Sequence, residues 1–110
     1  MIKYNIIMNL KNVTQKLEEI MPKFIEIQTE YANFMYEYEN VKARFTVDET
    51  TMGLGNQTMR DAEVMRRLEV EGLSEKKLEV GNRYYKLKTE RDFLMELSKN
   101  LRVIEMGGEK

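Results

Sequence analysis

Apolar residues recur at steps of three and four along the first half of the chain, with polar residues between them. The run extends from Leu10 to Phe45 without a gap. A sustained repeat of about 3.5 residues keeps one apolar stripe on a helix and draws that stripe toward a partner helix. The pattern therefore predicts one long helix over residues 10–45.

A second, less regular stripe returns through the second half and predicts a helix over residues 58–105. Arg91 interrupts this stripe, and the irregularity indicates that the second helix faces two neighbours instead of one. We interpret the two stripes together as an oligomer seam. Its predicted members are Leu10, Val13, Leu17, Ile20, Phe24, Ile27, Tyr31, Phe34, Tyr38, Val41, Phe45, Val80, Tyr84, Leu87, Leu94, Leu97, Leu101 and Ile104.

Proline and capping residues refine the first helix. Pro22 removes a backbone donor and predicts a kink, and the alternative is a short helix followed by a longer one that starts at Pro22. Asn9 and Asn12 are both candidate N-caps. Residues 46–57 combine β-branched residues with glycines and Asn, and they predict a loop without helix.

The second helix has its own predicted start and a break. Thr58 is the expected N-cap, with Asp61 completing a shortened capping box, and the apolar face is expected to follow with Ala62, Met65 and Leu68. Gly72 suits a left-handed helix end, so a break is expected there, with a new start near Ser74.

The fold class that follows is all-α: a long antiparallel helical hairpin with a coiled-coil-like seam, assembling into a dimer or helical bundle. Length predicts a single helical domain over residues 1–110, with a lead-in over 1–9 and a tail over 106–110. A hairpin this small has little interior of its own, so self-association is expected on energetic grounds.

Composition narrows the chemistry. The chain carries 18 Lys and Arg against 19 Asp and Glu, for a formal net charge of −1, which gives no general attraction to nucleic acid or anionic membrane. It has no Cys and no His, so thiolate sites and imidazole catalysis are excluded. We expect no enzymatic activity, no metal and no cofactor. The first residues do not form a signal peptide and no stretch reaches membrane-span length, so a cytoplasmic location is expected.

Basic residues are concentrated in the second helix, with tyrosines among them. Cations that reach phosphates and aromatic faces that stack on bases are what single-stranded nucleic acid requires. The candidate contacts are Arg60, Arg66, Arg67, Arg83, Tyr85 and Lys88. Acidic residues lie three or four positions from many of these cations, however, so surface ion pairs such as Glu63 with Arg67 are the simpler expectation.

Two segments carry a resemblance to a known group of proteins. The segment G-N-Q-T-M-R-D-A-E (55–63), followed by a basic helix and the leucine seam L-M-E-L-S-K-N-L-R-V-I (94–104), resembles small phage and prophage helical-hairpin accessory proteins. The resemblance covers about the last half of the chain and implies a phage-type accessory protein acting near single-stranded DNA or a host target. No site residue is transferred by it.

The sequence thus predicts a homo-oligomeric, non-enzymatic protein that works through protein–protein interaction, with a host or phage protein as partner. Two alternatives stand beside this prediction. One is a nucleic-acid-binding accessory protein of phage replication or recombination, and the other is an inhibitor of a host defence or replication protein.

Overall fold

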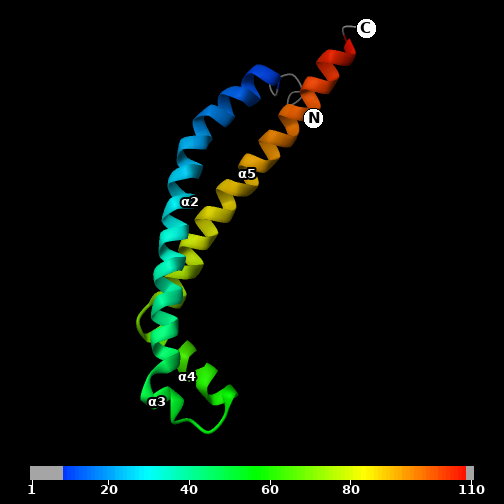
Figure 1. Cartoon of the computed structure of the whole chain (residues 1–110). Helices are drawn as coiled ribbons and strands as arrows, with labels where there is room; N and C mark the ends of the chain where they lie inside the picture. The colour runs from blue at the N-terminus through cyan, green and yellow to red at the C-terminus, as the bar shows by residue number, and fades with distance from the viewer. Residues whose placement is uncertain (1–8, 109–110) are drawn as a thin grey trace. The chain divides into compact units, whose positions relative to one another are not determined.

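The computed structural model describes residues 9–108, and all regular elements in that range are helices (Figure 1). They are α2 (Leu10–Val47), α3 (Glu49–Met52), α4 (Gln57–Val70) and α5 (Leu73–Gly108). The predicted all-α class and the helical hairpin are confirmed. Residues 1–8 of the predicted lead-in over 1–9, and residues 109 and 110 of the predicted tail over 106–110, lie outside the described range.

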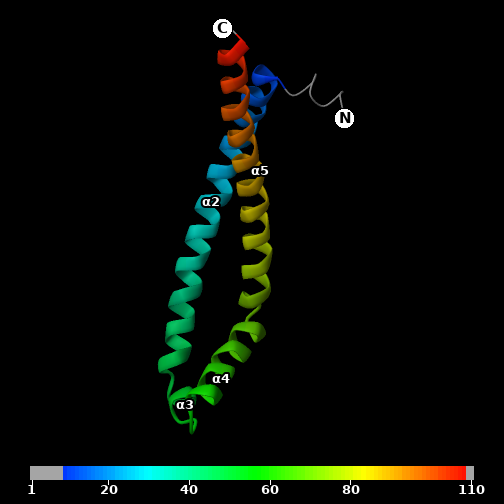
Figure 2. The same ribbon diagram turned by 90° about the vertical axis from the view of Figure 1, so that its right-hand side faces the viewer.

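Length predicts a single domain, and within the chain the structure distinguishes two compact packing units. Unit 1 holds the described residues 9–27 and 84–108, and unit 2 holds residues 28–83. Both long helices contribute to both units, whereas α3 and α4 belong to unit 2 alone (Figure 2).

Unit 1 is an antiparallel pair formed by the first part of α2 and the last part of α5. Its core is aliphatic: Val13, Ile20 and Leu94 are buried, and four leucines pack around them, namely Leu17, Leu87, Leu97 and Leu101. The ring of Phe24 stacks on Tyr84 at a centroid distance of 5.9 Å, and the Arg91 guanidinium lies 4.1 Å from the Phe24 centroid. Arg91 therefore interrupts the apolar stripe while still covering its neighbour, through a cation–π contact.

Unit 2 has an aromatic core at the level of α4. Phe34, Tyr38, Val64 and Leu68 are buried, with Met35, Val41, Phe45 and Leu73 packed against them. Lysines at the start of α5 lie over the two rings, because Lys76 Nζ is 5.3 Å from the Phe34 centroid and Lys77 Nζ is 4.7 Å from that of Tyr38. Each lysine covers an aromatic face while its charge stays near water.

The helix α2 runs through Pro22 as one element, so the alternative of two separate helices is not observed. Pro22 lacks the donor that would reach the Glu18 carbonyl, but both residues are exposed and water can satisfy that oxygen. Of the two candidate N-caps, Asn9 is the one that caps α2, because its Oδ1 accepts a hydrogen bond from the Asn12 backbone N–H at 3.0 Å.

The prediction of a loop without helix over residues 46–57 is wrong in part. The helix α2 continues to Val47. In its last turn the Thr46 hydroxyl donates a hydrogen bond to the Lys42 carbonyl at 2.8 Å, so this polar side chain has a partner within the helix. The helix α3 then forms because Asp48 caps it, accepting from the Thr50 backbone N at 2.9 Å. Capping chemistry here outweighs the low helix propensity of the threonines.

The start of α4 also differs from the prediction. Asn56, not Thr58, is the N-cap, and its Oδ1 accepts from the Met59 backbone N at 2.9 Å. The buried face consists of Val64 and Leu68, one helical turn apart, whereas Ala62 and Met65 are exposed. The predicted face was therefore wrong except at Leu68, because the side of α4 that packs on the core of unit 2 runs through Val64 and Leu68.

The break near Gly72 is present between α4 and α5. Gly72 has a φ of 74°, a left-handed conformation that glycine adopts without steric penalty. The helix α5 begins at Leu73 and extends to Gly108, past the predicted end at 105. Glycine lowers helix propensity by about 1 kcal/mol per residue, which weakens a long helix but does not stop it.

Candidate functional site

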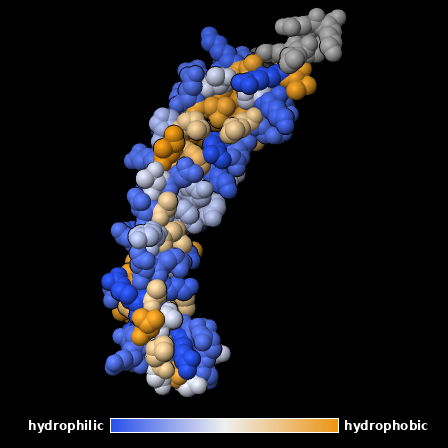
Figure 3. Space-filling view, viewed as in Figure 1, coloured by the Kyte–Doolittle hydropathy of each residue, from blue (hydrophilic) through white to orange (hydrophobic). Residues whose placement is uncertain are grey.

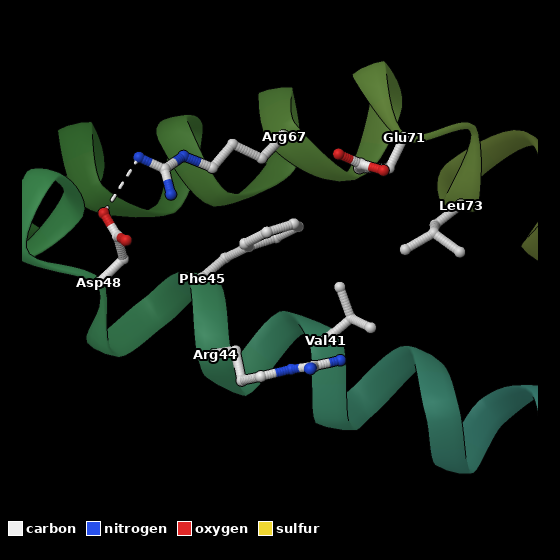
Figure 4. Close-up of a pocket in the computed structure, with 7 residues that line it drawn as sticks. All are labelled: Val41, Arg44, Phe45, Asp48, Arg67, Glu71 and Leu73. Atoms are coloured by element: carbon white, nitrogen blue, oxygen red, sulfur yellow. Dashed lines mark hydrogen bonds and ion pairs between the residues drawn. The ribbon is translucent and has the colours of Figure 1, made fainter.

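A hollow with a volume of about 470 Å³ lies in unit 2 (Figure 4). Val41, Phe45 and Leu73 point into the space between α2 and α4 and form an apolar floor. Charged side chains surround this floor. They are Arg44, Asp48, Arg67 and Glu71. Such a combination of apolar floor and charged rim is typical of a site that binds an amphipathic group.

Arg67 is the centre of the charged network in this pocket. Its Nε donates to Glu63 at 3.0 Å and its terminal nitrogen donates to Asp48 at 3.2 Å, across 19 positions of sequence. The guanidinium also lies 5.7 Å from the Phe45 ring centroid. Arg67 thus ties α4 to the end of α2, and the predicted ion pair between Glu63 and Arg67 is confirmed.

Hydrogen bonds within this network shift its pKa values away from neutrality. Donation from Arg66 and then from Arg67 lowers the pKa of Glu63 to about 2. The pKa of Asp48 is lowered chiefly by the Thr50 backbone N–H and then by Arg67, while Glu63 and Asp48 raise the pKa of Arg67. These groups all stay ionised at neutral pH, so the network keeps its charges fixed.

Two other charges of the rim are not part of the network. Arg44 and Glu71 make no ion pair within the described part of the chain, and both side chains belong to exposed residues. They present one positive and one negative group beside the apolar floor. A ligand that carries both signs of charge would match this rim.

The structure places nearly all members of the predicted seam inside the packing units. Val13, Ile20, Phe24, Ile27, Phe34, Tyr38, Val80 and Leu94 are buried, and Leu10, Leu17, Tyr31, Val41, Phe45, Tyr84, Leu87, Leu97 and Leu101 are half-buried. Ile104 differs, since 66% of it is exposed. The stripe that the sequence assigned to assembly is therefore largely used to pack the chain on itself.

The predicted nucleic-acid contacts are distributed over both units, and all four arginines among them have intrachain partners. Arg60 donates to the Leu54 carbonyl at 3.2 Å, Arg66 pairs with Glu63 at 2.6 Å, and Arg83 pairs with Glu30 at 2.7 Å. Arg67 has the two carboxylates described above. A phosphate would have to compete with these carboxylates for the same donors.

Tyr85 and Lys88, the other two candidates, lie together in unit 1. Tyr85 is 54% exposed, makes an edge contact with Tyr84 at 5.0 Å, and has Lys88 Nζ 5.9 Å from its ring centroid. Sequence reasoning singled out Tyr85 but missed Phe93, which is 61% exposed on the same helix. The available signal was its spacing: Phe93 follows Tyr85 by eight residues and lies beside the seam residue Leu94.

On the face drawn in Figure 3, hydrophobic patches are separated by stretches of hydrophilic residues. No helix in the described range combines the length and the apolar character that a membrane crossing requires. Among the same residues, no group of three or more acidic, His or Cys side chains is arranged to hold a metal ion.

Comparison with protein-family models, with curated proteins and with solved structures gives no match for this chain.

Proposed function

We propose that this protein acts without catalysis, by associating with copies of itself and by binding another protein. One observation carries the proposal. The apolar stripes are largely consumed by packing within the chain, yet large apolar side chains are exposed on the outer face of α5 in unit 1, among them Tyr85, Phe93 and Val103. Isolated exposed apolar residues are ordinary, but aromatic residues gathered on one helix face are typical of protein interfaces.

The pocket of unit 2 supports the second half of the proposal. Its floor suits one apolar side chain of a partner, and Arg44 and Glu71 on the rim suit flanking charges of opposite sign. The ordered Arg67 network holds the pocket wall in place, which lowers the entropy lost on binding. We propose an amphipathic segment of a partner protein as the ligand.

The resemblance to small phage proteins supports a setting for this activity. A phage-type protein would work in the cytoplasm of the host, and its partner would be a phage protein or a host protein. An inhibitor of a host defence or replication protein is one form of such binding, and it requires no catalytic group on this chain.

Sedimentation equilibrium over a wide concentration range tests self-association. We expect a mass above that of one chain, 13.1 kDa, with an equilibrium that responds to concentration. A mass of one chain at every concentration would remove self-association from the proposal.

Partner binding is tested by comparing proteins retained from host lysate by the wild type and by charge variants of the pocket. We expect a partner held by the wild type to be released by Arg44→Glu, because that charge makes no intrachain ion pair within the described residues and can be reversed without disturbing the network. Glu39→Ala, on an exposed part of α2, is the control and should retain the partner. Equal retention by wild type and Arg44→Glu would exclude the pocket.

Single-stranded nucleic acid is the second candidate ligand, and the exposed Tyr85 ring beside Lys88 favours it. An aromatic face with a neighbouring cation can stack a base and contact its phosphate. Fluorescence anisotropy with a labelled oligonucleotide should then show binding that weakens steeply with salt and is lost in Tyr85→Ala. Absence of binding at low salt would remove this candidate.

A further inference from the structure

The outer face of α5 in unit 1 has an internal order that goes beyond exposure. Tyr85, Thr89 and Phe93 are exposed and recur every four residues, so they lie along one face of the helix. The small residue is at the centre, with one aromatic ring on each side of it at equal spacing. A second helix could approach closely over Thr89 and pack between the rings.

The charges around Thr89 are ordered by sign. Lys86 and Lys88 precede Thr89 by three residues and by one, and Glu90 and Asp92 follow it by one and by three. Arg91 lies in the same stretch, but its guanidinium is turned to the Phe24 ring of α2, 4.1 Å from the ring centroid. If this segment meets an antiparallel copy of itself, the basic half of one copy lies over the acidic half of the other. A parallel copy in the same register would place lysines on lysines and carboxylates on carboxylates, which is unfavourable.

Most of these charges are not committed within the chain. Lys86, Lys88 and Glu90 make no ion pair in the part of the chain that the structure describes, and the i,i+4 pairs that their spacing allows are not formed. Asp92 accepts from its neighbour Arg91 at 2.8 Å and keeps an exposed side chain. Lys88 is half-buried and Glu90 also lines a hollow with Lys16 and Lys23 of α2, whereas Lys86 and Asp92 are exposed. All four side chains keep surface that a second chain can contact.

We propose that this face, centred on Thr89, docks antiparallel on the same face of a second copy, with a twofold axis at Thr89. The proposal rests on the self-association proposed above and assigns its surface. Tyr85 of each copy lies beside Phe93 of the other, and the two lysines of each copy face the two carboxylates of the other. Such a contact is isologous and closed, so it produces a dimer and not a filament.

The exposed aromatic side chain at the start of this face is already held in place. The edge contact with Tyr84 and the nearby Lys88 ammonium restrict the Tyr85 ring. A ring that is ordered before binding loses less entropy when the second copy arrives. Tyr84, a seam residue, therefore orders the exposed tyrosine that follows it directly.

Charge reversal tests the surface. Lys86→Glu with Lys88→Glu makes the face wholly acidic, and Glu90→Lys with Asp92→Lys makes it wholly basic. We expect either double variant alone to weaken dimerisation at least tenfold in sedimentation equilibrium, and a one-to-one mixture of the two to recover the dimer. Lys11→Glu with Arg102→Glu makes the same change of net charge as the first variant at other exposed positions of unit 1 and should dimerise like the wild type.

A cysteine cross-link tests the axis, since the chain has no Cys. Thr89→Cys should form a disulfide-linked dimer on oxidation, whereas Arg102→Cys should not. Far-UV circular dichroism on every variant checks that helicity is retained, as expected for substitutions at exposed or half-buried positions.

The outcomes separate the two proposals. If the wild type dimerises and both charge-reversed variants dimerise equally well alone, self-association stands and this face is not its surface. If the wild type is a monomer at every concentration, both proposals fail. Loss of the dimer in each double variant with recovery in the mixture supports both.

Discussion

The two packing units bury their residues by different means. Unit 1 relies on aliphatic side chains between two helices, centred on Val13, Ile20 and Leu94. Unit 2 relies on aromatic rings covered by lysines and on the ion pairs of Arg67. The difference follows from where the helices begin and end. The helix ends between α2 and α5 all fall in unit 2, and each end leaves backbone groups that need partners.

Apolar burial thus dominates the core of unit 1, where the helices run uninterrupted, whereas the chain reversal in unit 2 also has two helix caps and charged hydrogen bonds. The following substitutions test that difference, from the largest expected effect to the smallest.

A charge in either core should be the most damaging change. Phe24 is 2% exposed in unit 1 and Phe34 is 6% exposed in unit 2, so Phe24→Asp and Phe34→Asp each bury a carboxylate in an apolar core. We expect each to lose more than about 4 kcal/mol of stability, with lower helicity in circular dichroism. Tyr36→Asp, at a position that is 72% exposed, is the control. Wild-type helicity and unfolding temperature in both core variants would contradict the fold.

Truncation of a core leucine compares the two units directly. Leu68 in unit 2 is fully buried and Leu94 in unit 1 is 4% exposed, so we expect Leu68→Ala and Leu94→Ala each to lose about 2–5 kcal/mol in urea unfolding. Leu78→Ala, at an exposed position, should lose far less. A loss below about 1 kcal/mol at either site would mean that the core there is not closely packed.

The two asparagine caps should differ in strength. Asn56→Ala should lose about 1 kcal/mol, since its side chain holds the start of α4 within unit 2. Asn9→Ala should lose less, because the first turn of α2 can fray without breaking other contacts. Serine also accepts at this position, so Asn56→Ser should restore most of the stability in thermal unfolding. Equal losses for Asn9→Ala and Asn56→Ala would contradict the distinction.

Lowering the pH should reduce the stability of unit 2, because Glu63 becomes protonated. Its pKa is lowered from 4.5 to about 2 in the folded chain, so its ionised form stabilises the fold above the higher value, and this contribution is lost as the pH falls toward the lower one. Wild type and Glu63→Gln should therefore differ most near neutrality and converge near the folded pKa of Glu63. Thermal unfolding across this pH range checks the convergence, with Glu39→Gln as the control for removing one carboxylate. Parallel curves for wild type and Glu63→Gln would refute the role of this pair.

Sequence reasoning was most successful where one repeat dominates. The stripe from Leu10 to Phe45 specified both the long helix and most of its buried side, because the same positions satisfy periodicity and packing. It was least successful between residues 46 and 57. The glycines and β-branched residues there favour a loop, whereas Asp48 and Asn56 have a strong capping preference and start helices at both ends of the segment. A composition averaged over twelve residues hides two single residues of this kind, and α3 was missed for that reason.

The candidate sites were harder to foresee for a different reason. The ion pair of Asp48 with Arg67 joins residues 19 positions apart, and no local pattern marks such a pair. Pairs within one helix, such as Glu63 with Arg67, follow from spacing and could be predicted. The order of charges around Thr89 was visible in the sequence, but its meaning depended on knowing that Tyr85 and Phe93 are both exposed.

Pro22 should make the first turns of α2 open locally more readily than the rest of the helix. Pro22 has no backbone N–H to donate to the Glu18 carbonyl, so α2 lacks one backbone hydrogen bond at this point. The turns before and after it are therefore coupled by one hydrogen bond fewer than elsewhere in the helix. Native-state hydrogen exchange should show this as a lower free energy of opening for the turns that precede Pro22 than for those that follow it. The start of α2 then behaves as its own small cooperative segment, exchanging amide protons while the rest of the helix stays closed.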